Sequence, residues 1–289
     1  MSMKTPRTNL WKILCSACSA CSALIVVTTV AAAQDAAPRA RAAAPIDITG
    51  YWVAVITEDW RWRMMTPPKG DYASVPITDE GRRVADAWNL TKDEAAGLAC
   101  KPYGIGNIMR MPGRMHITWQ DDNTLKVEFD AGTQTRLLQF GAKPARIGAP
   151  TWQGYSAAEW KPAGQQGTVD RNNTPNGPSP AGAGLGPRNP ASAAPSHGGS
   201  LFVTTTNFRE GYLRKNGVPY SANATITEYF DKVGPEPNGD IILLVRTVVE
   251  DPKYLQLPFI TSTHFKLEKD GAKWSPSPCK IDPPVEPGK

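Results

Sequence analysis

The chain has 289 residues, 32 lysines and arginines against 27 aspartates and glutamates, and a formal net charge of +5. A charge balance this mild does not predict nucleic-acid binding, which requires a concentrated basic face. The chain contains only three histidines, which excludes a histidine-rich metal centre.

The first 33 residues have the pattern of a cleaved signal peptide. Three basic residues stand within residues 1–12, residues 13–30 are mostly apolar and small, and residues 31–33 are alanines that match a cleavage site. We therefore expect cleavage after Ala33 and a periplasmic or secreted protein. The alternative is an uncleaved membrane anchor, for which the apolar stretch is short and rich in Cys, Ser and Thr compared with a span of about 20 residues.

Signal cleavage changes the charge and the expected membrane behaviour of the chain. It would remove three basic and no acidic residues, leaving 29 basic against 27 acidic residues and a net charge of +2. Since no other apolar run is long enough to cross a bilayer, we expect no stable membrane span after cleavage. The oligomeric state does not follow from the sequence.

Five cysteines divide between the signal segment and the mature chain. Cys15, Cys18 and Cys21 have a spacing that indicates an iron–sulfur cluster in a cytosolic domain, but here they leave with the signal peptide. Cys100 and Cys279 remain. Because an exported chain folds in an oxidising compartment, we expect them to form one disulfide, closing a loop of about 180 residues.

Composition divides the rest of the chain into one ordered domain and several polar segments. Residues 34–45 are rich in Ala, Pro and Arg and are expected to form a flexible leader, and residues 281–289 a tail. Residues 163–199 contain few large apolar side chains, so we expect a disordered insertion there. The prediction is a single β domain over 46–280, interrupted by that insertion.

Strand-like runs account for most of the domain. They occupy residues 51–57, three stretches within 114–140, and residues 200–208, 224–230, 240–250 and 259–268. Asp121-Asp122-Asn123 and Ala131-Gly132 separate the three stretches as hairpin turns. Residues 78–90 form the one helical pattern, with Thr78 as its cap. These elements predict an all-β fold, an antiparallel β-barrel or sandwich with one short helix.

Two resemblances accompany this pattern. Gly50-Tyr51-Trp52 resembles the G-x-W on the first strand of lipocalin-type barrels, although a core tryptophan on an ordinary strand would carry the same residues. Residues 100–110, 151–160, 211–230 and 248–259 are similar to an uncharacterised family of exported bacterial β-rich proteins. That family has the ordered blocks W-x-G-Y-S, P-[HY]-S, [DE]-D-P and P-[WF].

The second resemblance implies no reaction. Relatives often have G-H-P-H-S where this chain has residues 217–221, "GVPYS", so any histidine chemistry at that block is in doubt here. The mature sequence also lacks G-x-S-x-G, H-E-x-x-H, a Walker loop and a Rossmann fingerprint. Residues 121–123 are predicted as a turn rather than a calcium site. We therefore expect no metal and no cofactor, and the sequence leaves open whether the chain is an enzyme.

Residues 56–64, "ITEDWRWRM", combine acids, arginines and tryptophans. If the strand at 51–57 continues, its period of two places Glu58, Trp60 and Trp62 on the face of Trp52. The intervening Asp59, Arg61 and Arg63 would then occupy the opposite face. The pattern predicts an aromatic face that carries one acid.

Glu228 and Glu58 are the candidate catalytic residues. Each lies on an otherwise apolar strand face, where a carboxylate needs a partner or a raised pKa. Two such acids could act as acid and base if they share a cavity. The alternative is that each pairs with an arginine, with Arg136, Arg214 and Arg246 as candidates.

His116 and His264 each lie on the more polar face of a predicted strand. We expect both to face outward or lie at the rim, because the opposite faces are the more apolar. If the barrel interior is the polar side, both would line it together.

Three functional hypotheses remain. The first is a binding protein for a small apolar or aromatic molecule, in a cavity lined by Trp52, Trp60, Trp62, Trp119, Tyr229, Arg214, His116 and His264. The second is a cofactor-free lyase, isomerase or cyclase that uses Glu58 or Glu228 as acid and base. The third is a non-catalytic envelope protein whose long loop recruits a partner.

Overall fold

The computed structural model describes residues 39–162 and 198–285. The predicted signal peptide and nearly all of the predicted insertion lie outside these ranges. Within them, no helix is both long and apolar enough to cross a membrane.

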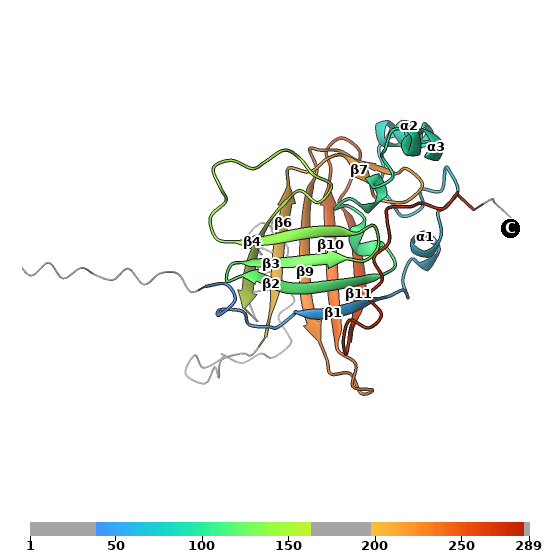
Figure 1. The fold of residues 1–289 in the computed structure, drawn as a ribbon. Coiled ribbons are helices and arrows are strands. Elements are labelled where there is room, and N and C mark those ends of the chain that lie inside the picture. Colours follow the sequence, from blue (N-terminus) through green and yellow to red (C-terminus); the bar gives the residue numbers. More distant parts are fainter. Residues whose placement is uncertain (1–38, 163–197, 286–289) are drawn as a thin grey trace, which may run out of the picture. The chain divides into compact units, whose positions relative to one another are not determined.

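Nine strands close into a single barrel, so the choice between barrel and sandwich is settled in favour of the barrel (Figure 1). The order around the barrel is β1-β11-β10-β9-β6-β5-β4-β3-β2, with β2 pairing again with β1. The strands are β1 (Gly50–Val55), β2 (Arg114–Asp121), β3 (Thr124–Phe129), β4 (Gln134–Phe140), β5 (Tyr155–Pro162), β6 (Gly199–Thr206), β9 (Thr225–Val233), β10 (Ile242–Glu250) and β11 (Phe259–Glu268). The short strands β7 (Gly211–Tyr212) and β8 (Pro219–Tyr220) form a separate pair.

Every neighbouring pair in this barrel is antiparallel except β4 and β5, which are parallel. The exception follows from the odd number of strands, since a ring of nine cannot alternate direction at every step. The two predicted hairpins within 114–140 are confirmed, with turns between β2 and β3 and between β3 and β4.

Alternation along the strands fills the barrel with side chains. Trp52 of β1, Met115 and Ile117 of β2, Leu125 of β3 and Phe230 of β9 are almost fully buried and belong to one apolar cluster. Every strand of the barrel contributes residues to this cluster. A few buried polar side chains lie among them on the inner face of the barrel. The barrel interior is therefore a packed core.

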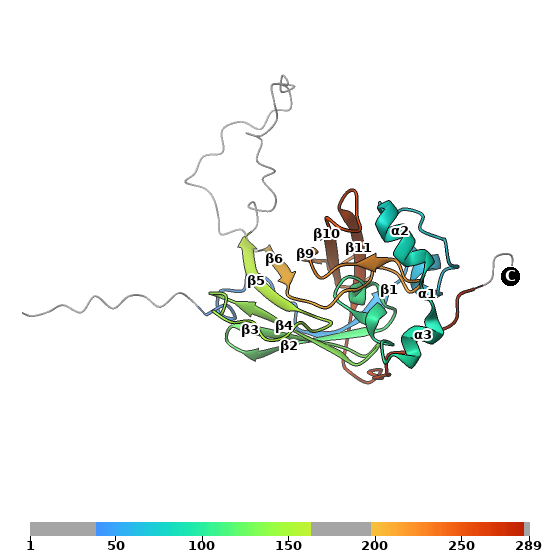
Figure 2. The ribbon, with the colours of Figure 1, turned by 90° about the horizontal axis from the view of Figure 1, so that it is seen from above.

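The two ends of the barrel are covered by different segments (Figures 1 and 2). Residues 39–48 cover one end, where Ala40 is buried and its carbonyl accepts a hydrogen bond of 2.9 Å from the Trp160 indole. Residues 39–45 are part of the segment whose composition predicts a flexible leader. The opposite end carries the short helices α1 (Trp60–Met64), α2 (Asp79–Asp86) and α3 (Leu90–Ala95), the 3₁₀ turns η1 (Lys101–Tyr103) and η2 (Ile108–Arg110), and the β7–β8 pair. We call this second covering the cap.

The cap contains both a confirmed and a wrong prediction. Helix α2 begins where expected, with the Thr78 side chain accepting a hydrogen bond from the Gly81 amide, although it ends at Asp86. The strand expected to continue to residue 57 and beyond ends at Val55, and α1 follows instead. Asp59 has a φ of 55°, a left-handed conformation that no strand accommodates, so the period of two is lost there.

The predicted disulfide is confirmed. Cys100 and Cys279 are joined, with a sequence separation of 179 residues. The Tyr103 hydroxyl donates a hydrogen bond of 2.6 Å to the Lys280 carbonyl, and the Ser277 amide donates one of 2.8 Å to the Asp130 carbonyl. The disulfide and these two hydrogen bonds therefore attach the C-terminal segment to the cap and to the end of β3.

Candidate functional site

Glu228 is closed inside the barrel by an arginine. Its side chain is fully buried, and both of its oxygens accept hydrogen bonds from Arg136, at 3.1 and 2.5 Å. The hydroxyls of Ser156 and Thr205 also lie 3.4 Å from the Arg136 guanidinium. This arrangement is a buried ion pair with supporting hydroxyls, and it gives Glu228 no free face toward a substrate.

Glu58 lies elsewhere, outside the barrel wall. Its Oε1 atom is 3.4 Å from Arg63 Nη1 and 3.4 Å from His264 Nδ1, and its Oε2 atom accepts a hydrogen bond of 2.6 Å from Thr57. About 30% of its side chain is exposed. Glu58 and Glu228 therefore do not share a cavity, and each contacts an arginine.

The two described histidines face outward. His116 stacks on Tyr51 with the ring centroids 3.9 Å apart, and its Nδ1 atom is 3.5 Å from Glu128. His264 lies on the outer face of β11 beside Glu58, with 39% of its side chain exposed. They do not line a common interior.

The aromatic residues of the first hypothesis are dispersed over the molecule. Trp52 is a core residue whose indole donates to the Ile48 carbonyl. Trp119 lies at the end of the barrel near residues 39–48 and contacts Phe140 and Trp160. Tyr229 is on the outer face of β9 under the guanidinium of Arg246.

Trp60 and Trp62 both belong to α1 but point in different directions. Trp60 is 57% exposed. Trp62 is partly buried, and its indole donates a hydrogen bond of 3.0 Å to Asp71. The guanidiniums of Arg61 and Arg214 lie over its ring, at 4.8 and 4.3 Å from the centroid. Trp62 and Arg214 are thus two predicted site residues that the structure brings together.

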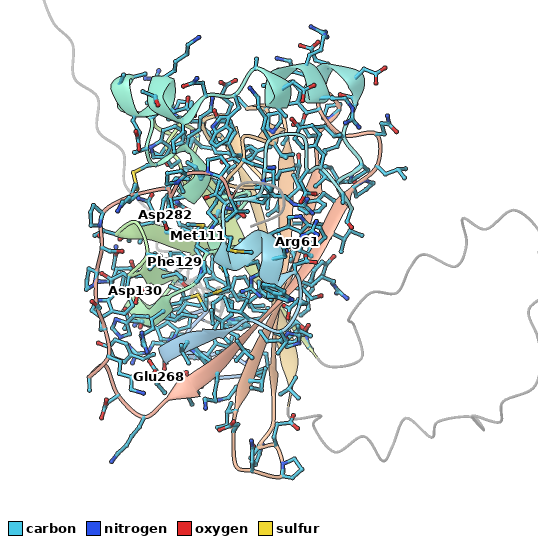
Figure 3. All side chains as sticks on the ribbon, turned by 90° about the vertical axis from the view of Figure 1, so that its right-hand side faces the viewer. Arg61, Met111, Phe129, Asp130, Glu268 and Asp282 are labelled. Carbon is cyan, nitrogen blue, oxygen red and sulfur yellow. A yellow bond between two sulfur atoms is a disulfide. The ribbon has the colours of Figure 1, made fainter. Side chains whose placement is uncertain are left out.

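Arg214 belongs to a group of buried arginines in the cap. Arg63 of α1, Arg110 of η2 and Arg214 of the β7–β8 turn are 2%, 4% and 1% exposed. Figure 3 faces this end of the barrel, where Arg61 marks α1 and Met111 follows Arg110. We call Arg63, Arg110 and Arg214 the arginine cluster.

The β7–β8 turn holds Arg214 in place. Asn216 is fully buried and donates hydrogen bonds to the carbonyls of Pro68 and Asp71, at 2.9 and 3.1 Å. Gly217 has a φ of 84°, and a Cβ there would lie 2.2 Å from the Trp88 ring. Only glycine adopts this positive φ without strain and leaves room for the Trp88 ring. The turn is therefore held in place by Trp88 and by the backbone of residues 68 and 71.

Three carboxylates lie next to the cluster, and each contacts a different arginine. Asp59 is 2.9 Å from Arg110, Asp71 is 2.8 Å from Arg61, and Glu58 is 3.4 Å from Arg63. Arg214 has no carboxylate within ion-pair distance among the residues of the described ranges.

Five buried nitrogens of the cluster have no hydrogen-bond partner within the described part of the chain. They are Nε, Nη1 and Nη2 of Arg214, Nη2 of Arg63 and Nη1 of Arg110. An arginine can donate five hydrogen bonds, and buried polar groups in native proteins are normally paired. A buried guanidinium with all three nitrogens unpaired is therefore an unusual feature that calls for a partner.

The electrostatics of the cluster are unfavourable without a partner. Burial, followed by the positive charge of Arg110, lowers the pKa of Arg214 from its ordinary value to about 10. Burial also lowers the pKa of Arg63, and Arg110 again adds to this effect. The Arg63 side chain also donates a hydrogen bond of 3.1 Å to the Arg110 carbonyl, so these two arginines are neighbours.

One signal for this cluster is visible in the sequence. Arg110 stands in "NIMRM", between large apolar residues, where a charge indicates burial or function. Arg63 was assigned to a strand face that does not exist. Arg214 alone was included among the ligand-lining candidates.

One other potential site is less developed. A surface hollow of about 460 Å³ at the opposite end of the barrel is lined by four polar residues and by Ala44, Ile46 and Trp119. In the described part of the chain, no three His, Cys, Asp or Glu side chains gather as metal ligands.

Comparisons of this chain with protein-family models, curated proteins and solved structures found no match.

Proposed function

We propose that this protein binds a small molecule that carries an anionic group, and that the arginine cluster of the cap holds that group. The observation that carries the proposal is the Arg214 guanidinium, 1% exposed and with all three nitrogens unpaired among the described residues.

An anion is the partner that such a cluster lacks. Desolvating a charge without a partner costs several kcal/mol, and three neighbouring guanidiniums add mutual repulsion. An oxyanion between them would accept charge-assisted hydrogen bonds, which are about twice as strong as neutral ones. Such an anion would both pair the desolvated charge of Arg214 and reduce the repulsion between the guanidiniums.

This proposal changes the kind of ligand expected from the sequence. An apolar or aromatic ligand needs an apolar cavity, but the barrel core is packed with side chains and the expected aromatic lining is dispersed. Trp62 remains part of the site, although it contacts Arg61 and Arg214 through its ring. Its ring covers the Arg214 guanidinium in the ligand-free protein.

Thermal-shift and calorimetric titrations with sulfate, phosphate and benzoate test the proposal. At least one of these anions should raise the melting temperature of the wild type and give saturable binding heat. Arg214→Met should abolish both effects because the unpaired guanidinium is removed.

Arg246→Met is the matched control, since Arg246 is an exposed arginine on the outer face of β10. It should bind anions like the wild type. Equal anion binding by wild type and Arg214→Met would exclude the cluster as the site.

We also propose that the chain is exported and cleaved after Ala33. The Cys100–Cys279 disulfide supports this, because such cross-links persist mainly in oxidising compartments. The intact mass and N-terminal sequence of the mature protein from periplasm and medium test it. A mature chain that begins at Gln34 is expected, and a chain that keeps Met1 would contradict the proposal.

Acid–base catalysis at Glu58 is the second candidate function. It is favoured by the contact between Glu58 Oε1 and His264 Nδ1, which would orient a partly exposed imidazole. Once a turnover assay exists, Glu58→Gln and His264→Gln should each lower kcat without preventing ligand binding. Unchanged turnover in both variants would show that neither Glu58 nor His264 carries the catalysis.

A further inference from the structure

We infer that the arginine cluster selects a singly charged carboxylate over a doubly charged phosphate group. This inference rests on the proposed function, and it specifies the class of ligand that the same site binds.

The charges around the cluster leave a surplus of one positive charge. Arg61, Arg63 and Arg110 each contact one of the three nearby carboxylates, which are those of Asp71, Glu58 and Asp59. Arg214 is the remaining charge. Burial lowers the pKa of Lys215, the neighbour of Arg214 in sequence, and the negative charge of Asp282 in the C-terminal segment opposes this effect.

A monoanion would neutralise this surplus, whereas a dianion would leave one negative charge in a buried site beside three carboxylates. Residual charge in a poorly solvated environment is unfavourable, and like charges add to the cost. The site should therefore discriminate by ligand charge as well as by ligand size.

The donor geometry also suits a carboxylate. All three nitrogens of the Arg214 guanidinium are unpaired within the described ranges, so one edge of this planar group can form two parallel hydrogen bonds to a carboxylate. Arg110 also has an unpaired buried nitrogen, Nη1, among the described residues of the cluster.

Access to Arg214 requires α1 to move, because Trp62 of α1 covers the guanidinium. The helix is five residues long, and its only buried side chain is that of Arg63. The ion pairs of Asp59 with Arg110 and of Arg61 with Asp71 attach it to the rest of the cap. A movement of α1 that uncovers Arg214 therefore acts against these two ion pairs.

Calorimetric titration with benzoate, phenylphosphonate and benzamide tests the inference, at a pH where phenylphosphonate is doubly charged. We expect benzoate to bind at least tenfold more tightly than phenylphosphonate, and the neutral benzamide not to bind. Arg214→Met should abolish benzoate binding, which locates the site.

Asp59→Asn supplies the charge test. Asparagine tolerates the positive φ of this position, and the change raises the local charge by one. The preference for benzoate over phenylphosphonate should shrink at least tenfold or reverse. Asp71→Asn makes the same change in charge and serves if Asp59→Asn does not fold.

The possible failures are distinguishable. If phenylphosphonate binds the wild type as tightly as benzoate and Arg214→Met loses both, the anion site stands and the carboxylate inference is overturned. An unaltered preference in the folded aspartate variants would overturn the charge argument. Absence of binding by both anions would overturn the inference, and the proposed function falls with it only if sulfate and phosphate also fail to bind.

Discussion

Arg136 and Arg214 are both buried arginines, and they differ in what surrounds the guanidinium. Arg136 contacts both oxygens of Glu228 and two hydroxyls within the barrel. Arg214 contacts the ring of Trp62 and has no hydrogen-bond acceptor in the described ranges. Removing the charge should therefore have opposite consequences for stability at the two positions.

Arg214→Met is predicted to stabilise the ligand-free protein. Methionine removes an unpaired buried charge and keeps an apolar side chain of comparable length, which should add about 1–3 kcal/mol to the free energy of unfolding. Urea denaturation without added anion measures it. Arg214→Lys keeps the charge and should not show the gain. A loss of stability in Arg214→Met would mean that Arg214 has structural partners.

Arg136→Met is predicted to destabilise the protein by about 3–5 kcal/mol, because it leaves Glu228 buried without a partner. The same denaturation experiment measures it. Adding Glu228→Leu in the same chain removes the orphaned carboxylate and should recover much of the loss. If the double variant is as unstable as the single one, packing around Arg136, rather than its ion pair, is the dominant contribution.

The sequence predicts the positions of single residues better on regular strands than in the cap. The period of two correctly placed Glu228 on a buried face, with Arg136 among its expected partners. The same period failed at Glu58, since Asp59 takes a left-handed conformation and turns the chain into α1. The geometry of the arginine cluster depends on three separate segments, which no local pattern relates.

Among the elements, α2 has a defined N-terminal cap. The Thr78 hydroxyl accepts a hydrogen bond of 3.0 Å from the Gly81 amide and lies 3.1 Å from the Lys253 carbonyl. Thr78→Ala should therefore lower the free energy of unfolding by about 1 kcal/mol. Thr78→Ser retains the hydroxyl and is the control. Equal stability of the alanine and threonine proteins would show that the cap contributes little.

The disulfide links two elements that are distant in sequence. It closes a separation of 179 residues, for which the chain-entropy model gives a stabilisation of about 5 kcal/mol. The Cys100→Ser/Cys279→Ser variant should lose stability up to that amount in urea denaturation. Adding a reductant should affect the wild type and leave the variant unchanged. A variant as stable as the wild type would show that the C-terminal contacts suffice.

Local sequence signals predict some elements of this fold, whereas others depend on contacts between residues that are distant in sequence. Hairpin β2–β3 and hairpin β3–β4 carry their turn signals within the sequence, so local chemistry predicts them. The parallel pairing of β4 with β5 arises only because nine strands must close a ring. Helices α1 and α3 are too short for a helical period to show.

In the described part of the chain, the two ends of the barrel differ in the charges that they bury. One end of the barrel is covered by residues 39–48, next to the aromatic contacts of Trp119 and Trp160. The other end is covered by the cap, which contains the arginine cluster. The barrel core is closed to ligands by its own packing, so the cap is the part of the molecule that can be remodelled by binding.

The pH dependence of stability at alkaline pH is also a property of the whole molecule. Burial, as the largest cause, raises the pKa of Tyr103, Tyr212 and Tyr220 above the ordinary value of 10. Above pH 10 the unfolded chain loses these protons while the folded chain keeps them. The free energy of unfolding should then fall as pH rises, by about 1.4 kcal/mol per pH unit for each tyrosine.

Arg214 acts in the opposite direction, because its pKa of about 10 lies below its ordinary value, so the unfolded chain holds this proton longer. Tyr72 and Tyr155 act in the same direction as these three tyrosines, and Arg63 and Lys215 act in the same direction as Arg214. Five tyrosines outweigh three basic groups, so urea denaturation at pH 9, 10 and 11 should show a net loss of stability. Tyr220→Phe should make the loss less steep, while Arg214→Met, which removes the opposing contribution, should make it steeper. A wild-type stability that is constant or rises over this range would mean that the tyrosines ionise equally in the folded and unfolded chains.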